Sequence, residues 1–167
     1  MDSWHISYYK KLRSSYPNTP FIFSFRKPSE VIRSQLIEPG MHAAVGVIQP
    51  QLFGLELSEI LTMEKPLYIS KVLESYFEKY LSIISTDPNA LFINYNDGIW
   101  MNFEKVQSFL GLNTEDHIKD LMLERTKFHS KHPNQSFSEE AIGTAIPEYQ
   151  HYIFELYNKL CSLANQH

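Results

Sequence analysis

The chain has 167 residues, of which 43% are hydrophobic, 14% aromatic and 20% charged. This length allows a single domain, and the composition excludes an intrinsically disordered chain because it supplies enough apolar side chain for a core. The formal net charge of −4 excludes a general nucleic-acid binder, which carries a basic excess, but it allows a local basic pocket for one anionic ligand.

No secretion signal or membrane span is recognisable in the sequence. Residues 1–9 are polar and aromatic, and no uninterrupted apolar run approaches the roughly 20 residues of a membrane-spanning helix. Cys161 is the only cysteine, which rules out an intrachain disulfide, and its amphipathic surroundings predict a small core residue. We therefore expect a cytoplasmic protein with no membrane or nucleic-acid partner.

The N-terminal third predicts a helix, a strand and a second helix. A short helix over residues 6–15 is ended by the Pro- and Asn-containing residues 16–20. The apolar run of residues 21–25 then predicts a strand buried on both faces, as in parallel sheets. Pro28 suits the first turn of the next helix, where its missing N–H costs nothing. Residues 38–53 form an unusually apolar loop, which we expect to pack over a cleft or a partner.

The rest of the chain continues this alternation. Apolar residues recur at three- and four-residue steps over residues 66–85, which predicts a long helix. A second short apolar strand over residues 90–95 is followed by a turn and by a helix for which Gly111 suits the C-cap. Residues 125–140 are polar and predict a loop, and Pro147 suits the start of the last helix.

Two buried strands separated by helices favour an α/β fold with a parallel sheet flanked by helices. Two strands are too few for a complete domain of this class, so we expect the N-terminal half of the sheet to lie outside this chain. A sheet without that half would expose an edge beside residues 21–25 or 90–95. Such an edge favours self-association.

The most specific segment is residues 25–34, which read Phe-Arg-Lys-Pro-Ser-Glu-Val-Ile-Arg-Ser. An arginine at the carboxyl end of a strand points into the crevice where α/β sheets bind ligands, and its guanidinium can grip a phosphate with two hydrogen bonds. Ser34 lies two helical turns further on and would offer its hydroxyl to the same phosphate. The alternative is that Arg26 caps the helix or forms a salt bridge with Glu30.

A second segment, residues 91–97, reads Leu-Phe-Ile-Asn-Tyr-Asn-Asp and precedes a helix ending in Phe-Leu-Gly. The two segments together resemble the sulfotransferase family, and the resemblance extends over about residues 2–163. It implies a P-loop NTPase-like parallel sheet, present here without its N-terminal P-loop part. It also implies that the co-substrate 3′-phosphoadenosine 5′-phosphosulfate binds through its 3′-phosphate to Arg26 and Ser34. Tyr95 would lie near its adenine and 3′-phosphate side, the alternative being a core tyrosine, and Asn96 stands where the family usually has Glu.

The same resemblance implies two further sets of residues. His5 precedes Arg26 by 21 residues, about one short of the spacing of the family's catalytic histidine, and a neutral imidazole there would deprotonate an acceptor hydroxyl. It lacks the flanking Lys-Thr of the family, and the alternative is a packing histidine. Ser130 and Lys131 fall where cytosolic members carry an Arg-Lys-Gly loop that closes over the phosphate, the alternative being a solvated loop.

Other candidates are weaker. His117, His129 and His132 invite a metal proposal, but no carboxylate or cysteine in regular spacing completes a ligand set, so we expect no metal. Residues 39–42 read Pro-Gly-Met-His and resemble a segment of some bacterial sulfotransferase-like proteins, where it would lie on the acceptor side.

No Gly-x-x-x-x-Gly-Lys or Pro-Lys-Ser-Gly segment occurs in the chain. In the family this P-loop holds the 5′-phosphosulfate with its backbone amides and a lysine. We therefore expect residues 1–167 to be one partial sulfotransferase-like domain, whose parent activity is transfer of sulfate to an acceptor hydroxyl or amine on an unidentified small molecule or peptide, impaired in this chain.

Several alternatives remain open at this point. The chain is a fragment, a truncated reading frame or a degenerate relative that serves as a non-catalytic nucleotide-binding or protein-interaction module. A P-loop kinase fragment would leave the spacing from Arg26 to Ser34 and the Tyr95 segment unexplained.

Overall fold

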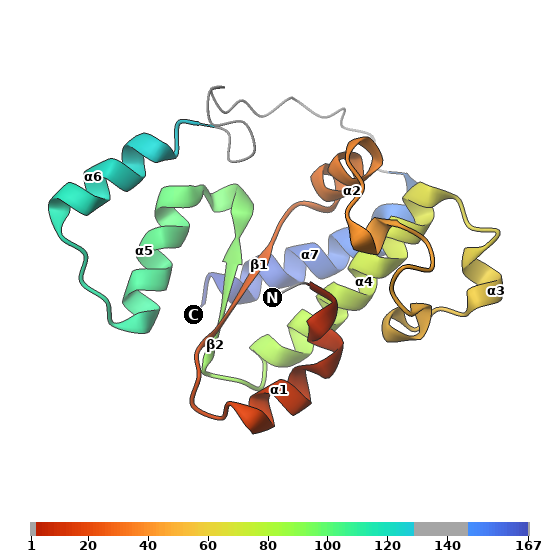
Figure 1. The fold of residues 1–167 in the computed structure, drawn as a ribbon, viewed down its shortest axis with the longest axis horizontal. Coiled ribbons are helices and arrows are strands. Elements are labelled where there is room, and N and C mark those ends of the chain that lie inside the picture. Colours follow the sequence, from red (N-terminus) through yellow and green to blue (C-terminus); the bar gives the residue numbers. More distant parts are fainter. Residues whose placement is uncertain (1–2, 129–146, 167) are drawn as a thin grey trace.

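The computed structural model describes residues 3–128 and 147–166 (Figure 1). The elements of its first half are the 3₁₀-helix η1 (Ser3–Tyr8), α1 (Tyr9–Ser15), β1 (Phe21–Phe25), α2 (Pro28–Ile37), the 3₁₀-helices η2 (Met41–Ala43) and η3 (Pro50–Phe53), and α3 (Leu57–Ile60). Those that follow are α4 (Lys65–Ile84), β2 (Ala90–Asn94), η4 (Tyr95–Asp97), α5 (Ile99–Leu110), α6 (Asp116–Arg125), η5 (Glu148–Gln150) and α7 (His151–Ala164).

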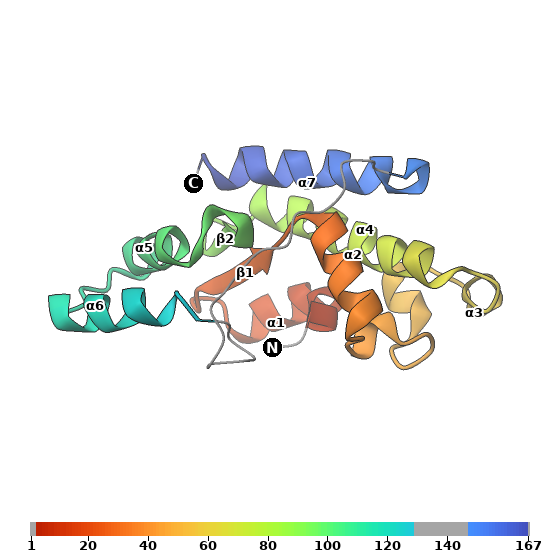
Figure 2. The ribbon, with the colours of Figure 1, turned by 90° about the horizontal axis from the view of Figure 1, so that it is seen from above.

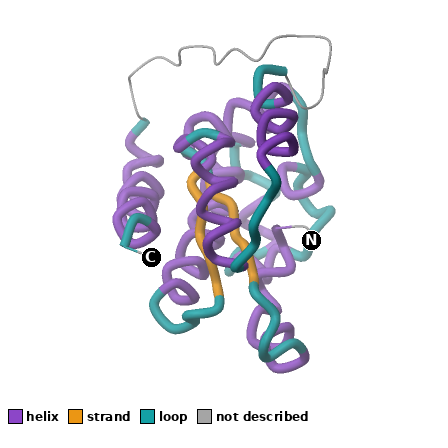
Figure 3. Tube along the Cα trace, turned by 90° about the vertical axis from the view of Figure 1, so that its left-hand side faces the viewer, coloured by secondary structure: helices purple, strands orange, loops and turns teal. Residues whose placement is uncertain are grey.

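The two strands are parallel neighbours in a two-stranded sheet, with Phe21 opposite Ala90 and Phe25 opposite Asn94. Helices flank this small sheet (Figure 3). The predicted α/β class, with both apolar runs as parallel strands of one sheet flanked by helices, is therefore confirmed.

The core lies between the sheet and the helices α4 and α7. Seen from above, α7 forms the outermost layer and α4 lies between it and α1 (Figure 2). Phe23 of β1 stacks on Phe92 of β2 with ring centroids 4.8 Å apart and contacts Tyr80 of α4 at 5.4 Å. Burying each such side chain stabilises the fold by about 1.5–3 kcal/mol. The strands are apolar, although each is short, because their side chains form this aromatic layer.

The two strands differ in how deeply they are buried. Side chains alternate between faces along a strand, and Phe21, Phe23 and Phe25 turn toward the core. Ile22, by contrast, is 41% exposed and Ser24 is exposed as well. The prediction that this strand is buried on both faces is therefore wrong, because no element within the described residues covers the second face of β1. β2 is more deeply buried, and α4, α5 and α7 all contact it.

The remaining elements agree in part with the predictions made from the sequence. α4 spans Lys65–Ile84, as its periodicity predicts, and Gly111 adopts the left-handed φ of 63° that its role as the C-cap of α5 requires. Residues 38–53, expected to pack over a cleft or a partner, bury Ala43, Ile48 and Phe53 in the core of the chain itself. α6 was not predicted, and it has no buried residue that would produce a clear apolar stripe.

The described helices, over residues 3–128 and 147–166, include none with the length and apolar character needed to cross a membrane.

Arg13 of α1 ties together the amino ends of both strands. Its Nη1 donates to the carbonyl oxygen of Thr19, before β1, at 2.7 Å, and its Nη2 donates to that of Asn89, before β2, at 3.2 Å. Its Nε donates to the Asp87 carboxylate at 2.7 Å, and the Tyr9 hydroxyl donates to the same carboxylate. One guanidinium thus holds the two turns from which the parallel strands start.

We call the hydrogen-bonded cluster of Arg13, Asp87 and Tyr9 the clamp. It predicts an acid-sensitive contribution to stability from Asp87, whose side chain is 13% exposed. Burial alone raises the pKa of Asp87, but hydrogen bonds from Tyr9, the Asn89 N–H and Arg13 outweigh it, so the pKa lies below its usual value. A depressed carboxyl pKa stabilises the fold above the unfolded-state pKa and stops doing so as the pH falls through the folded-state pKa. Asp87→Asn should lower the free energy of unfolding at pH 7 by about 1.5–3 kcal/mol and flatten its fall below about pH 4 in urea denaturation.

The matched control is Asp116→Asn, which changes a 95% exposed carboxylate on α6. We expect it to alter the free energy of unfolding by less than about 0.5 kcal/mol. Equal stability of the two variants would contradict the assigned role of the clamp.

Candidate functional site

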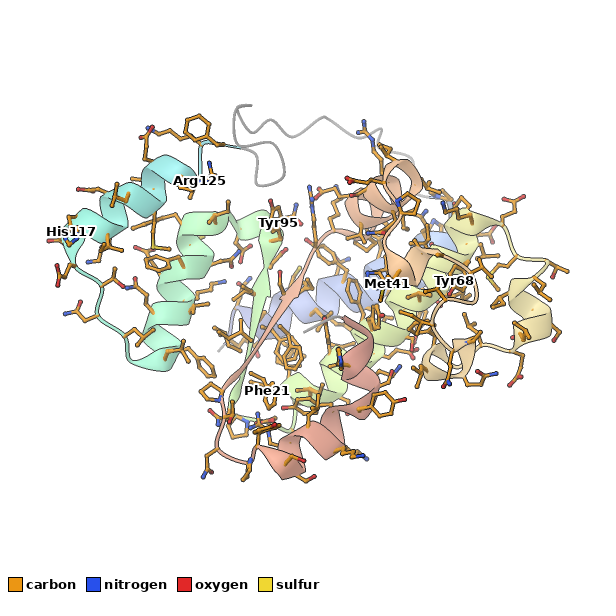
Figure 4. All side chains as sticks on the ribbon, in the orientation of Figure 1. Phe21, Met41, Tyr68, Tyr95, His117 and Arg125 are labelled. Carbon is orange, nitrogen blue, oxygen red and sulfur yellow. The ribbon has the colours of Figure 1, made fainter. Side chains whose placement is uncertain are left out.

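The carboxyl ends of β1 and β2 form a corner that brings two predicted site residues together. Parallel strands in register end at the same edge of a sheet, so Arg26, after β1, lies beside Tyr95, after β2. The Arg26 guanidinium carbon lies 4.7 Å from the centroid of the Tyr95 ring, a cation–π contact. Figure 4 labels Tyr95 at this end of the strands.

Glu30 fixes the orientation of this guanidinium. Arg26 Nε donates to Oε2 of Glu30, which lies in the first turn of α2, at 2.5 Å. The salt bridge that was the alternative interpretation of Arg26 is therefore present. The carboxylate also suits the first turn of a helix, where the helix dipole favours negative charge. The contact leaves the Arg26 side chain 32% exposed, at the surface of the corner.

Asn96 links the two strand ends and holds Glu30 in turn. Its Nδ2 donates to both Glu30 carboxylate oxygens, at 3.1 and 2.9 Å, and its Oδ1 accepts from the Lys27 N–H at 3.0 Å. A carboxylate at this position, as the sulfotransferase resemblance leads one to expect, would lie against Glu30 and repel it. The amide of Asn96, which donates hydrogen bonds and carries no charge, therefore suits a position beside Glu30.

Asn94 anchors the same turn to α7. Its Oδ1 accepts from the Asn96 N–H at 3.0 Å, and its Nδ2 donates to the Tyr157 hydroxyl at 3.1 Å and to Cys161 Sγ at 3.4 Å. Burial raises the pKa of Tyr157 to about 12 and also raises the pKa of the Cys161 thiol, so both groups are neutral at pH 7. The corner consequently rests on a neutral hydrogen-bonded network behind it.

A cavity of about 280 Å³ opens beside Arg26 and Tyr95. Its remaining lining comes from β1, α2, the loop after α2 and the aromatic face of α4, namely Ser24, Phe25, Val31, Gln35, His42, Leu73, Tyr76, Phe77 and Tyr80. Ser34 is exposed on α2 and lies outside this lining, whereas its neighbour Gln35 belongs to it. The cavity thus combines one cationic group with a mostly aromatic wall.

The other predicted residues lie elsewhere. His5 is half-buried in η1 and does not line this cavity. Ser130 and Lys131 fall outside the described residues, as do His129 and His132. His117 lies on α6 with its Nδ1 3.2 Å from Glu115 Oε2. Within residues 3–128 and 147–166, no three His, Cys, Asp or Glu side chains come close enough to hold a metal ion.

Sequence reasoning missed Asn94, Asn96 and Gln35 as parts of the site. An Asn-x-Asn pattern directly after an apolar strand was the available signal for the first two, because an Asn side chain readily accepts from the backbone N–H two residues on. The contribution of Gln35 depends on how α2 packs against α4, which the local sequence does not specify.

No protein-family model, curated protein or solved structure matches the chain. The sulfotransferase resemblance therefore rests on the sequence of residues 25–34 and 91–97 and stays a prediction.

Asn96→Asp tests whether the amide is needed beside Glu30. The new carboxylate would face that of Glu30 with no hydrogen to donate, and the like charges would repel. We expect the free energy of unfolding to fall by about 0.5–1.5 kcal/mol in urea denaturation, a modest value because Asn96 is exposed.

Two further variants separate this effect from a general effect of added charge. Glu30→Gln in the Asn96→Asp background should restore most of the loss, whereas Asn113→Asp, at an exposed position after α5, should change stability little. A loss that persists in the double variant would show that repulsion from Glu30 is not its cause.

Proposed function

We propose that the corner of Arg26 and Tyr95 binds the 3′-phosphate end of 3′-phosphoadenosine 5′-phosphosulfate, and that the chain carries the part of a sulfotransferase-like, P-loop NTPase-type fold that follows the P-loop. The observation that carries the proposal is the position of the Arg26 guanidinium, at the carboxyl end of β1 and 4.7 Å from the ring of Tyr95 on the neighbouring parallel strand. Ligands of open α/β sheets bind at this edge.

The chemistry of the corner suits a phosphate. A guanidinium matches the geometry of phosphate oxygens and stays charged at every physiological pH. The amino end of α2, directly after Arg26, adds the positive end of a helix dipole. Glu30 opposes an incoming anion, so we expect it to moderate the affinity while it keeps the guanidinium in place.

The cavity beside the corner suits part of the nucleotide. Its volume of about 280 Å³ is close to the lower end of small-molecule pockets, which span about 300–1,000 Å³. The half-buried ring of Tyr95 and the buried aromatic side chains of α4 would give a planar base apolar contacts. Ser34, Ser130 and Lys131 stay in the proposal as phosphate ligands that the resemblance alone implies.

The proposed parent reaction is in-line transfer of the sulfuryl group to an acceptor hydroxyl or amine. Its acceleration depends on donors positioned around the reacting sulfate, and Arg26 holds the opposite end of the nucleotide. His5 as a general base would contribute typically about 10²–10⁴-fold, far less than a full enzyme provides. We therefore expect the 167-residue chain by itself to bind the nucleotide without enzyme-like turnover.

Calorimetric titration with adenosine 3′,5′-bisphosphate tests the proposal. Arg26→Ala should weaken binding roughly tenfold to a hundredfold, because charge-assisted hydrogen bonds are each worth about 1.5–3 kcal/mol. Glu30→Gln should strengthen it by removing the competing carboxylate, provided that Asn96 still orients the side chain.

Lys159→Ala is the charge-matched control, since it removes one positive charge from an exposed position on α7. We expect the affinity of this variant to equal that of the wild type. Equal affinities for Arg26→Ala and wild type, or no measurable binding by either, would refute the site. Robust sulfate transfer by the wild-type chain, lost in Arg26→Ala, would instead support the site and contradict the expected lack of turnover.

A second candidate function, a protein-interaction module, is favoured by the outer edge of β1. The Phe21 N–H bonds Asn89 on the β2 side, and alternate residues of a strand direct their amides to opposite sides. Ile22 and Ser24 therefore direct their backbone groups away from β2, and no described strand pairs with that edge. We propose that a second copy of the chain pairs there, because edges of this kind template strand addition.

Ser24→Pro tests this edge while sparing the sheet. Proline removes the outward N–H and is tolerated on edge strands, whereas Ser24→Ala keeps the N–H. We expect sedimentation equilibrium to show concentration-dependent dimers for the wild type and Ser24→Ala, and monomers for Ser24→Pro. A monomeric wild type, or equal dimerisation of Ser24→Pro, would contradict the proposal.

A further inference from the structure

A groove of about 760 Å³ lies between the η1–α1 segment and the C-terminal half of α4. It is at the amino ends of the strands, near Phe21 in Figure 4, whereas the Arg26 corner is at the other end, near Tyr95. Its position, lining and charge are therefore independent of the proposed nucleotide site.

The groove is positively charged, whereas the chain as a whole is negatively charged. Four cations, Lys10, Lys11, Arg13 and Lys79, and one anion, Asp87, line it, so its net charge is positive. Because Arg13 and Asp87 neutralise each other at 2.7 Å, the excess resides on the three lysines. On a protein with a net charge of −4, this is a local attraction for an anion.

Lys79 is the most confined of these cations. Its half-buried Nζ donates to the Leu52 carbonyl oxygen at 2.6 Å and to Ser75 Oγ at 2.7 Å, both neutral acceptors. No carboxylate in the described residues lies within ion-pair distance of it. An ammonium has three N–H donors, so one is left for a ligand. Burial also lowers the pKa of Lys79, which means that its charge is not fully compensated by its surroundings.

The floor of the groove is apolar. Ile6 of η1 and Ile83 of α4 line it and are both almost fully buried, while Tyr8 stands exposed at its rim. A ligand that fills this space must therefore combine apolar contact with one negative end. The volume lies within the range of about 300–1,000 Å³ that small-molecule pockets span.

We infer that this groove binds an amphipathic carboxylate, with its apolar body along Ile6 and Ile83 and its carboxylate on the ammonium of Lys79. Lys10 and Lys11, exposed on α1, attract the anion from solution. A nucleotide or another highly charged ligand fits less well, since Lys10 and Lys11 are exposed to solvent and the apolar floor offers no partner for further buried charges.

The test compares decanoate with decan-1-ol, which has the same chain without the charge, by calorimetric titration below the micellar concentration. We expect the wild type to bind decanoate at least tenfold more tightly than the alcohol. Lys79→Met should weaken decanoate binding roughly tenfold to a hundredfold and leave binding of the alcohol unchanged. Lys159→Met, on the exposed side of α7, should bind both ligands like the wild type.

A second variant keeps the inference testable if Lys79→Met fails to fold, which a thermal melt would reveal. Lys10→Met/Lys11→Met changes only exposed side chains and should weaken decanoate binding several-fold, with a reduced dependence on salt. Equal affinity of the wild type for acid and alcohol, no binding of either, or unchanged decanoate binding by a folded Lys79→Met would overturn the inference.

Discussion

The contacts of Arg13 are the constraint on which the rest of the arrangement depends. Parallel strands have no hairpin to fix their register, and a slip by one residue would turn every side chain to the opposite face. Arg13 holds the turn before β1 and the turn before β2 at the same time, and so sets where both strands begin. With strands of equal length, a common start implies a common end, which places Arg26 beside Tyr95.

The same register explains how the two ends of the sheet come to differ. At the amino end, side chains of η1, α1 and α4 line a groove that combines two buried isoleucines with three lysines. At the carboxyl end, short polar side chains tie one strand to the other, and Asn96 connects the amide of Lys27 with the carboxylate of Glu30. Two parallel strands thus separate the lysine-containing groove from the Arg26 corner.

Sequence patterns predicted the elements whose signal is local. The unalternating apolar runs gave both strands, and three- and four-residue periodicity gave α4. α6 was not predicted because its apolar residues, such as Leu121 and Leu123, are exposed and form no apolar stripe toward a core. The exposure of Ile22 was not predictable either, since it depends on which elements cover the second face of β1.

The candidate site at Arg26 and Tyr95 could also be predicted only in part, because some of its contacts follow from local patterns and others do not. Arg26 and Tyr95 each follow an apolar strand, so their proximity follows once the strands are parallel and adjacent. The roles of Asn96 and Glu30 depend on a contact between residues 66 positions apart, which no local pattern encodes. The salt bridge and the proposed phosphate site are therefore not exclusive readings of Arg26, because the contact with Glu30 is what orients its guanidinium.

Nuclear magnetic resonance of the ¹⁵N-labelled chain, titrated with adenosine 3′,5′-bisphosphate, shows where an anion binds. We expect saturable shifts concentrated on the backbone amides of Lys27, Glu30 and Asn96 and on the Arg26 Nε–H, with little change near Arg13 at the other end of the strands. Shifts that fall instead on the lysines of α1, or a spectrum that does not change, would contradict the claim that the ends of the two parallel strands form an anion site.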